Sequence, residues 1–149
     1  MASPPSLPPP ARDVAAYGHW SEDHIRYSDL DAVGHANTNS IGVLFEHARV
    51  VMLNEMGMAQ DGGDPLCVLA TLNLEFVIEL KLFDKVRIGQ KVARIGNSSF
   101  TLHSALFVER DGNSVCGATC QAVIVVVDGK THRPTPIPAA ARSVLEKHA

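Results

Sequence analysis

The sequence contains few aromatic residues, few cysteines and no long hydrophobic run. Aromatic residues make up 5% of the 149 residues, and the three cysteines form no CxxC pair with histidines at zinc-binding spacing. We therefore expect neither a disulfide framework nor a metal site, and a reducing, cytoplasmic setting fits best. Cys116 and Cys120 lie four residues apart in an expected strand. Because side chains alternate along a strand, we predict that both point to the same face of the sheet.

An excess of basic charge is also absent. The formal net charge is −3, so nothing indicates a basic surface for nucleic-acid phosphates. No stretch approaches the roughly 18 apolar residues of a membrane-spanning helix, and the N-terminus lacks the basic start and apolar core of a signal peptide. The sequence therefore predicts no nucleic-acid partner and no membrane association, with the protein remaining in the cytoplasm.

Proline is concentrated at the N-terminus. Five of the first ten residues are proline, and such a segment favours a disordered or polyproline-like conformation. We predict a disordered tail over residues 1–18 and a single domain over residues 19–149, because a chain of this length can bury one core without disulfides.

One strong helical pattern follows the tail. Between residues 41 and 56, apolar side chains recur at the i, i+3, i+4 spacing of one helix face. Asn39 or Ser40 is expected to cap the start of this helix, and Gly57 to close its end. A second, short helix is expected over residues 139–148.

Most of the remaining chain has the pattern of strands. Apolar and polar residues alternate over residues 71–80, and further runs cover residues 84–95, 99–109 and 114–127. Gly-Asn and Asp-Gly dipeptides separate the last three runs and favour hairpins. The expected fold class is α+β, an antiparallel sheet of about five strands wrapped around one long central helix. Because one helix covers only part of the apolar strand surface, we predict at least a homodimer.

Three motifs in a fixed order carry a resemblance to a known family. Residues 26–49 contain the pattern D-x-D-x-x-G-H-x-N followed by E-x-A-R, and the segments KVARIGNSSFTL and V-D-G-x-T-x-R-P-x-P come after it. Together they resemble the 4-hydroxybenzoyl-CoA thioesterase-like family. The resemblance implies a hotdog fold and an enzyme, an acyl-CoA thioesterase that releases free CoA and a carboxylic acid as a homodimer or homotetramer. It implies no cofactor, because CoA is part of the substrate.

The first motif places candidate catalytic residues just before the long helix. An acid there lies beside the free N–H groups at the positive end of the helix. Such N–H groups stabilise the oxyanion that forms when a thioester carbonyl is attacked. We assign this role to the backbone amide of Thr38, with Asn39 as second choice. By resemblance, Asp31 is the catalytic carboxylate, and the sequence leaves open whether it acts as nucleophile or as general base.

The neighbouring polar residues have competing interpretations. Asp29 is expected to be structural and is the alternative to Asp31. Histidine as a residue type titrates near neutral pH, so His35 is a candidate base, but a loop histidine before a helix is more often a hydrogen-bonding brace. Asn37 either orients the attacking water or stabilises the loop. Glu46 is a secondary candidate that can instead pair with Arg49.

The resemblance also places part of the CoA-binding surface near the hairpin at residues 96 and 97. Arg94, Ser98 and Ser99 flank this hairpin, and Lys91 and Arg133 are further cations that can reach CoA phosphates. The competing interpretation is that these are ordinary exposed residues. No Gly-rich nucleotide loop is present.

The sequence departs from the family at two positions near the acyl group. The usual second asparagine is Thr38 and a common tyrosine is Ile41, so acyl specificity should differ. Two alternatives remain open: a non-catalytic hotdog subunit that binds acyl-CoA or acyl carrier protein, and a hydroxyacyl-thioester dehydratase. The dehydratase is disfavoured because His35 is followed by Ala36 and Asn37 instead of an H-F-P-like context.

Overall fold

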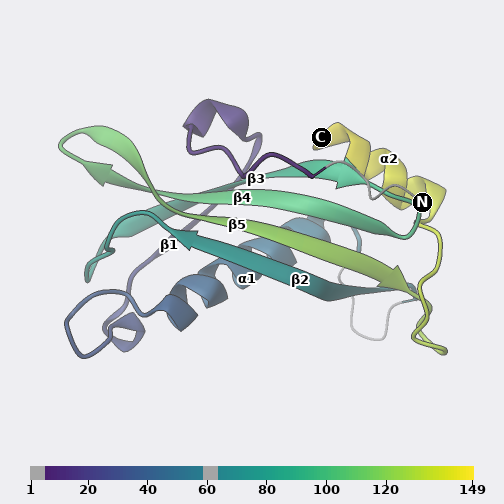
Figure 1. The fold of residues 1–149 in the computed structure, drawn as a ribbon, viewed down its shortest axis with the longest axis horizontal. Helices are drawn as coiled ribbons and strands as arrows, with labels where there is room; N and C mark the ends of the chain where they lie inside the picture. Colours follow the sequence, from purple (N-terminus) through teal and green to yellow (C-terminus); the bar gives the residue numbers. More distant parts are fainter. Residues whose placement is uncertain (1–5, 59–63) are drawn as a thin grey trace.

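The structure, a computed structural model, describes residues 6–58 and 64–149 and has the predicted α+β architecture (Figure 1). Five antiparallel strands form one sheet in the order β1-β3-β4-β5-β2. The strands are β1 (His19–His24), β2 (Leu66–Phe76), β3 (Lys85–Ile95), β4 (Ser99–Arg110) and β5 (Asn113–Val127). The helices are α1 (Thr38–Glu55) and α2 (Ala139–Lys147), with 3-10 turns η1 (Val14–Ala16) and η2 (Tyr27–Asp29).

Helix α1 lies along one face of the sheet (Figure 1). Its predicted apolar stripe, apart from the partly buried Val51, is buried in a core that also includes Leu145 of α2. The predicted caps at Asn39 or Ser40 are wrong, because Asn37 is the N-cap and its side chain accepts a hydrogen bond from the Asn39 N–H. Gly57 closes the helix with a φ of 72°, as predicted. Within the described residues, neither helix is long and apolar enough to cross a lipid bilayer.

The N-terminal segment lies across the opposite face of the sheet (Figure 1). Tyr17 is only 6% exposed and packs in a separate apolar cluster with Phe107 and Cys116, and its ring meets those of Trp20 and Phe107 edge-on or tilted. The predicted boundary of the tail at residue 18 therefore differs from the structure, because burial of Tyr17 orders the segment before it. Residues 1–5 of the predicted tail lie outside the described residues.

The two cysteines of β5 do not share a face, so that prediction is wrong. The pairing of β4 with β5 shifts at Leu106 and Phe107, whose partners are Ala118 and Cys116. Gly117 is thus an extra residue that reverses the alternation of side chains. Cys120 lies in the core under α1, whereas Cys116 lies in the cluster around Tyr17.

Strand β2 forms one edge of the sheet (Figure 1). It pairs with β5 on one side, and no described strand pairs with its other side. Several of its apolar residues are exposed, among them Leu72 at 43% and Phe76 at 48%. This strand therefore combines unpaired backbone groups with apolar side chains in contact with solvent.

Candidate active site

The loop between η2 and α1 is held in a tight turn by its own backbone. The Asp31 N–H donates to the His35 carbonyl at 2.8 Å, and the Gly34 N–H donates to the Asp31 carbonyl at 3.2 Å. Gly34 has a φ of 82°, a conformation that glycine adopts at little cost. The D-x-D-x-x-G-H pattern therefore encodes a turn that presents the Asp31 side chain beside the start of α1.

The Asp31 carboxylate uses one of its two oxygens to stabilise this turn. Its Oδ1 accepts hydrogen bonds from the Val33 N–H at 2.9 Å and the His35 N–H at 3.2 Å. Its Oδ2 accepts none from the described residues. Asp31 is exposed and lines a cavity of about 370 Å³ together with residues of the loop, of α1 and of the segment after β2. One oxygen thus remains available to a molecule in this cavity.

The first turn of α1 contributes a residue with a free amide to the lining of the same cavity. Asn37 accepts a hydrogen bond from the Asn39 N–H at 2.8 Å, so the amide of Asn39 is already occupied. The Ile41 N–H donates to the Asn37 carbonyl at 3.0 Å. Thr38 lines the cavity, and its N–H has no acceptor among the described residues. The geometry therefore supports Thr38 over Asn39 as an oxyanion donor, and it gives Asn37 a capping role.

His35 joins the loop to the segment that follows β2. Its Nε2 lies 3.1 Å from Oε2 of Glu79, and the next residue along, Ala36, donates its N–H to the Leu80 carbonyl at 2.8 Å. Both contacts match the brace that the sequence analysis favoured for His35. The ring also lines the Asp31 cavity, so a role in proton transfer stays a prediction.

Asp29 stabilises the chain on the other side of the loop. Its Oδ2 accepts a hydrogen bond from the Arg26 N–H at 2.8 Å and lies 3.7 Å from the Arg26 guanidinium. Its carbonyl accepts from the Asn37 N–H at 2.7 Å. Asp29 does not line the Asp31 cavity. These contacts agree with the structural role expected for Asp29 and leave Asp31 as the candidate carboxylate.

Comparison with known proteins identifies the family. Residues 25–145 match the family model of the thioesterase-like superfamily, which covers most of the chain. The chain belongs to the thioesterase-like superfamily. The sheet and central helix are accordingly those of a hotdog-fold thioesterase, and the resemblance to the 4-hydroxybenzoyl-CoA thioesterase-like group is confirmed.

Individual relatives of this superfamily are distant from the chain. YsmA of Bacillus subtilis (strain 168), a protein described as uncharacterised, is 24% identical over 88 residues, or 59% of this chain and 60% of YsmA. The PA5185 protein of Pseudomonas aeruginosa strain PAO1 is 28% identical with a TM-score of 0.83, over 95% of this chain and 96% of that protein. A 4-hydroxybenzoyl-CoA thioesterase mutant, solved in complex with 4-hydroxybenzoyl-CoA, is 12% identical with a TM-score of 0.77, over 85% and 97% of the two chains. The last likeness shows the fold alone.

The expected CoA-binding residues of this thioesterase-like chain lie far from Asp31 in one subunit. Ser99 pairs with Val125 of β5, whereas Phe76, at the Asp31 cavity, pairs with Ala118. Seven residues of β5 separate these partners, or about 23 Å of strand. One chain therefore does not bring Asp31 together with Arg94, Ser98 and Ser99, or with Arg133 beyond the end of β5. Lys91 is also not among the residues that line the Asp31 cavity. Their role in CoA binding stays a prediction.

The segment between β2 and β3 is the part of the site that the sequence analysis missed. Residues 77–80 were interpreted as a continuation of a strand, but β2 ends at Phe76 and the following residues line the Asp31 cavity. Asp84 secures this segment, because its carboxylate accepts hydrogen bonds from the Lys81 N–H and the Arg110 guanidinium. The contact with Lys81 is local, but no local pattern marks the contact with Arg110, which lies 26 residues further along the chain.

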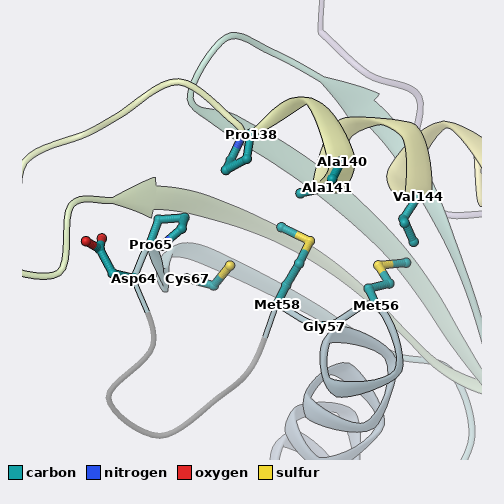
Figure 2. A pocket seen from close by; sticks show the side chains of 10 residues that line it. All are labelled: Met56, Gly57, Met58, Asp64, Pro65, Cys67, Pro138, Ala140, Ala141 and Val144. Atoms are coloured by element: carbon teal, nitrogen blue, oxygen red, sulfur yellow. The ribbon is translucent and has the colours of Figure 1, made fainter.

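A second cavity, of about 300 Å³, lies between the end of α1, the start of β2 and α2 (Figure 2). Met56, Met58, Cys67 and Val144 project toward it, and Asp64 lies at its edge. The Asp64 carboxylate already accepts a hydrogen bond from the Gly129 N–H at 2.9 Å. This lining includes the Asp64 carboxylate but no residue of the D-x-D-x-x-G-H-x-N motif, so the Asp31 cavity remains the candidate for chemistry. Among the described residues, no three His, Cys, Asp or Glu side chains are arranged to hold a metal ion.

Proposed function

We propose that this protein is an acyl-CoA thioesterase that acts in the cytoplasm as a homodimer, with Asp31 as the catalytic carboxylate and the Thr38 amide as an oxyanion donor. One observation carries the proposal: Asp31 and Thr38 line the same cavity, and one carboxylate oxygen of Asp31 and the backbone N–H of Thr38 have no partner among the described residues. The thioesterase-like fold supports it. The 4-hydroxybenzoyl-CoA thioesterase of similar fold, solved with 4-hydroxybenzoyl-CoA, supports the proposed substrate class only.

The site residues suit thioester hydrolysis by either of two routes. In one, Asp31 removes a proton from water, and the hydroxide adds to the thioester carbon. In the other, Asp31 itself adds to that carbon and forms an anhydride, which water then hydrolyses. Both place negative charge on the former carbonyl oxygen, where the Thr38 N–H donates to it. Collapse then breaks the C–S bond, and the CoA thiolate leaves and takes up a proton. Neither route uses a cofactor or a metal ion.

The proposed homodimer forms along β2. An edge strand that pairs with its own copy around a twofold axis is necessarily antiparallel, so the same backbone groups satisfy each other on both chains. Leu69, Leu72 and Phe76 would become covered, together with Val43 and Val50 on the neighbouring face of α1, all of which are exposed in one chain. The Asp31 cavity opens beside Phe76 and so lies next to this interface.

The proposal is tested by thiol release from a panel of short, long and aromatic acyl-CoAs. We expect wild-type turnover and a loss of at least about 100-fold in Asp31→Asn, because that change removes the acid–base or nucleophilic group. Asp111→Asn is the matched control, since Asp111 lies in the exposed β4–β5 hairpin with a positive φ that asparagine tolerates. A chelator should leave turnover unchanged.

Two results would contradict the assignment. Wild-type activity in Asp31→Asn, together with loss of activity in His35→Ala, would show that the roles are wrong. Binding of acyl-CoA without hydrolysis of any member of the panel would favour the non-catalytic subunit instead.

A further inference from the structure

Arg49 of α1 is a buried cation without a hydrogen-bond acceptor. Its side chain is 9% exposed, and its nearest carboxylate, on Glu46, lies 4.0 Å away and is 64% exposed. No described residue accepts a hydrogen bond from its guanidinium. A guanidinium carries five N–H donors. The buried side-chain atoms without a partner among the described residues do not include those of Arg49, so water in the groove still reaches its guanidinium. A second chain that covered the groove would displace this water, and the guanidinium would then need a new acceptor.

The guanidinium lies in a groove that opens at the unpaired edge of the sheet. Arg49 and Glu46 line a cavity of about 390 Å³ together with Leu53 of α1 and residues 65–67 and 69 at the start of β2. The rest of this lining is mainly apolar. Because β2 is the edge strand, a second copy of the chain that pairs there would cover the groove.

A twofold pairing of β2 would bring the groove of one chain to the Asp31 cavity of the other. With the axis at Thr71, the middle residue of β2, Leu66 would lie opposite Phe76 and Leu69 opposite Asn73 of the second copy. The start of β2 borders the Arg49 groove, and Phe76 borders the Asp31 cavity. In such a dimer the two cavities would adjoin across the interface twice.

The donors that one chain offers at the Asp31 cavity are few. Within one chain, Thr38 supplies the free amide of the first helical turn that lines this cavity, because the amides of Asn39 and Ile41 are occupied. Oxyanion sites gain most from several preorganised donors, and a cationic donor in a site closed to water is among the strongest.

We infer that Arg49 of the partner subunit completes the site of Asp31 and donates a hydrogen bond to the oxyanion of the tetrahedral intermediate. This inference rests on the proposed function. Arg49 forms and breaks no covalent bond, and its guanidinium stays protonated while the C–S bond breaks. When the product carboxylate leaves, its hydrogen bonds to Arg49 and to the Thr38 amide break.

The inference is tested with purified heterodimers. These are made by co-expressing two variant chains that carry different affinity tags. One chain carries Asp31→Asn and the other carries Arg49→Met, and each homodimer alone should lose at least about 100-fold in kcat. In the heterodimer, one of the two sites combines Asp31 with Arg49 of the other chain. We expect about half of the wild-type kcat, since one site of two is intact.

The matched control carries both substitutions on one chain, paired with a wild-type chain. Each site then lacks either Asp31 or the Arg49 of the other chain, so this heterodimer should be inactive. If Arg49 instead acted within its own chain, the two results would be exchanged, and the inference would be overturned. Full activity of the Arg49→Met homodimer would overturn it as well.

A second variant separates catalysis from assembly. Arg49→Lys keeps the charge but loses the planar fork of donors, and it should lower kcat with little change in KM or in dimer mass by light scattering. If Arg49→Met does not assemble, Arg49→Lys takes its place in the heterodimers. A wild-type protein without turnover refutes the proposed function, whereas unrecovered activity in the mixed dimer refutes only the role of Arg49.

Discussion

His35 and Glu79 join the loop that carries the candidate carboxylate to the segment that follows β2, with Nε2 of the imidazole 3.1 Å from Oε2 of the carboxylate. The contact is accompanied by a short antiparallel bridge between His35 and Lys81. Since both segments line the Asp31 cavity, the contact fixes the shape of the cavity as well as the orientation of the ring.

Removal of the Glu79 carboxylate tests whether His35 is a brace. The pair is exposed, with 32% and 70% of the two side chains accessible, and such pairs contribute about 1 kcal/mol or less. We expect Glu79→Ala to lower kcat by less than about tenfold, with an unchanged pH–rate profile, because the backbone bridge remains. Steady-state kinetics between pH 5 and 9 is the measurement.

Glu75→Ala is the control for that experiment, because Glu75 pairs with Arg12 and does not line the Asp31 cavity. Its kinetics should match the wild type. A loss above 100-fold in Glu79→Ala with a displaced acid limb would make His35 a proton-transfer group.

The Asn37 side chain caps α1, so its removal should loosen the helix start that holds Thr38. Loss of an N-cap side chain costs about 0.5–2 kcal/mol. We expect Asn37→Ala to lower the free energy of unfolding in urea by that amount and to lower kcat, whereas Asn37→Asp should restore both. Asn39→Ala is the control: its side chain makes no hydrogen bond with the described residues, and stability should not fall. Equal stability of Asn37→Ala and wild type would contradict the capping role.

Most elements of this fold were predictable because their signals are local. The apolar stripe of α1 and the hairpin dipeptides at the ends of β3 and β4 depend on neighbours along the chain, and the bounds of α1, β3, β4 and β5 lie within a few residues of those expected. Strand β1 was not predicted, and β2 covers residues 66–76 instead of the expected 71–80. Asp31 and His35 were found through a motif that encodes a turn. Both kinds of signal can be recognised in a single sequence.

Long-range contacts explain the features that were not predicted. Glu79 reaches the site only because β2 ends at Phe76 and the following chain turns toward the loop. The extra residue at Gly117 depends on the register between β4 and β5, which side-chain alternation within β5 does not reveal. The order of the segment before Tyr17 depends on Phe107 on the outer face of the sheet.

Asp84 should make the protein less stable in acid. Burial alone raises the pKa of its carboxyl group, but the hydrogen bonds from the Arg110 guanidinium and the Lys81 N–H outweigh burial and hold the pKa below its usual range. A depressed pKa in the folded state gives stability that is present above the unfolded-state pKa, about 3.9, and is lost as the pH falls through the folded-state pKa.

Arg110→Met tests this linkage. A hydrogen bond to a charged group contributes about 1.5–3 kcal/mol, and because this one is only partly buried we expect a loss near the lower end of that range at pH 7. The difference from wild type should shrink as the pH falls below about 4, because Asp84 of the wild type then also takes up a proton as the pH passes through its depressed pKa. Urea unfolding at pH 7, 5 and 3 measures it. Lys130→Met, which changes an exposed cation, should track the wild type at each pH. A constant difference across the series would contradict a role for Asp84 ionisation.

Cys116 and Cys120 lie on opposite faces of the sheet. Their thiols should therefore differ in reactivity, which two cysteines on one apolar face would not. Burial raises the pKa of Cys120 to about 11, against a smaller opposing effect of the nearby Arg49, and burial also raises the pKa values of Cys116 and Cys67. Only the thiolate reacts readily, so Cys120 should resist a maleimide in the native protein at pH 8.

Mass spectrometry of peptides from timed labelling measures this order. Cys67 is partly exposed and also lines the cavity beside α2, so it should react first, whereas Cys120 should react only in urea. In Cys67→Ala the fast native label should disappear, while labelling of the unfolded chain falls to two thiols. Native labelling of Cys120 at the rate of Cys67 would place its thiol outside the core, and the register of β5 derived from Gly117 would then be wrong.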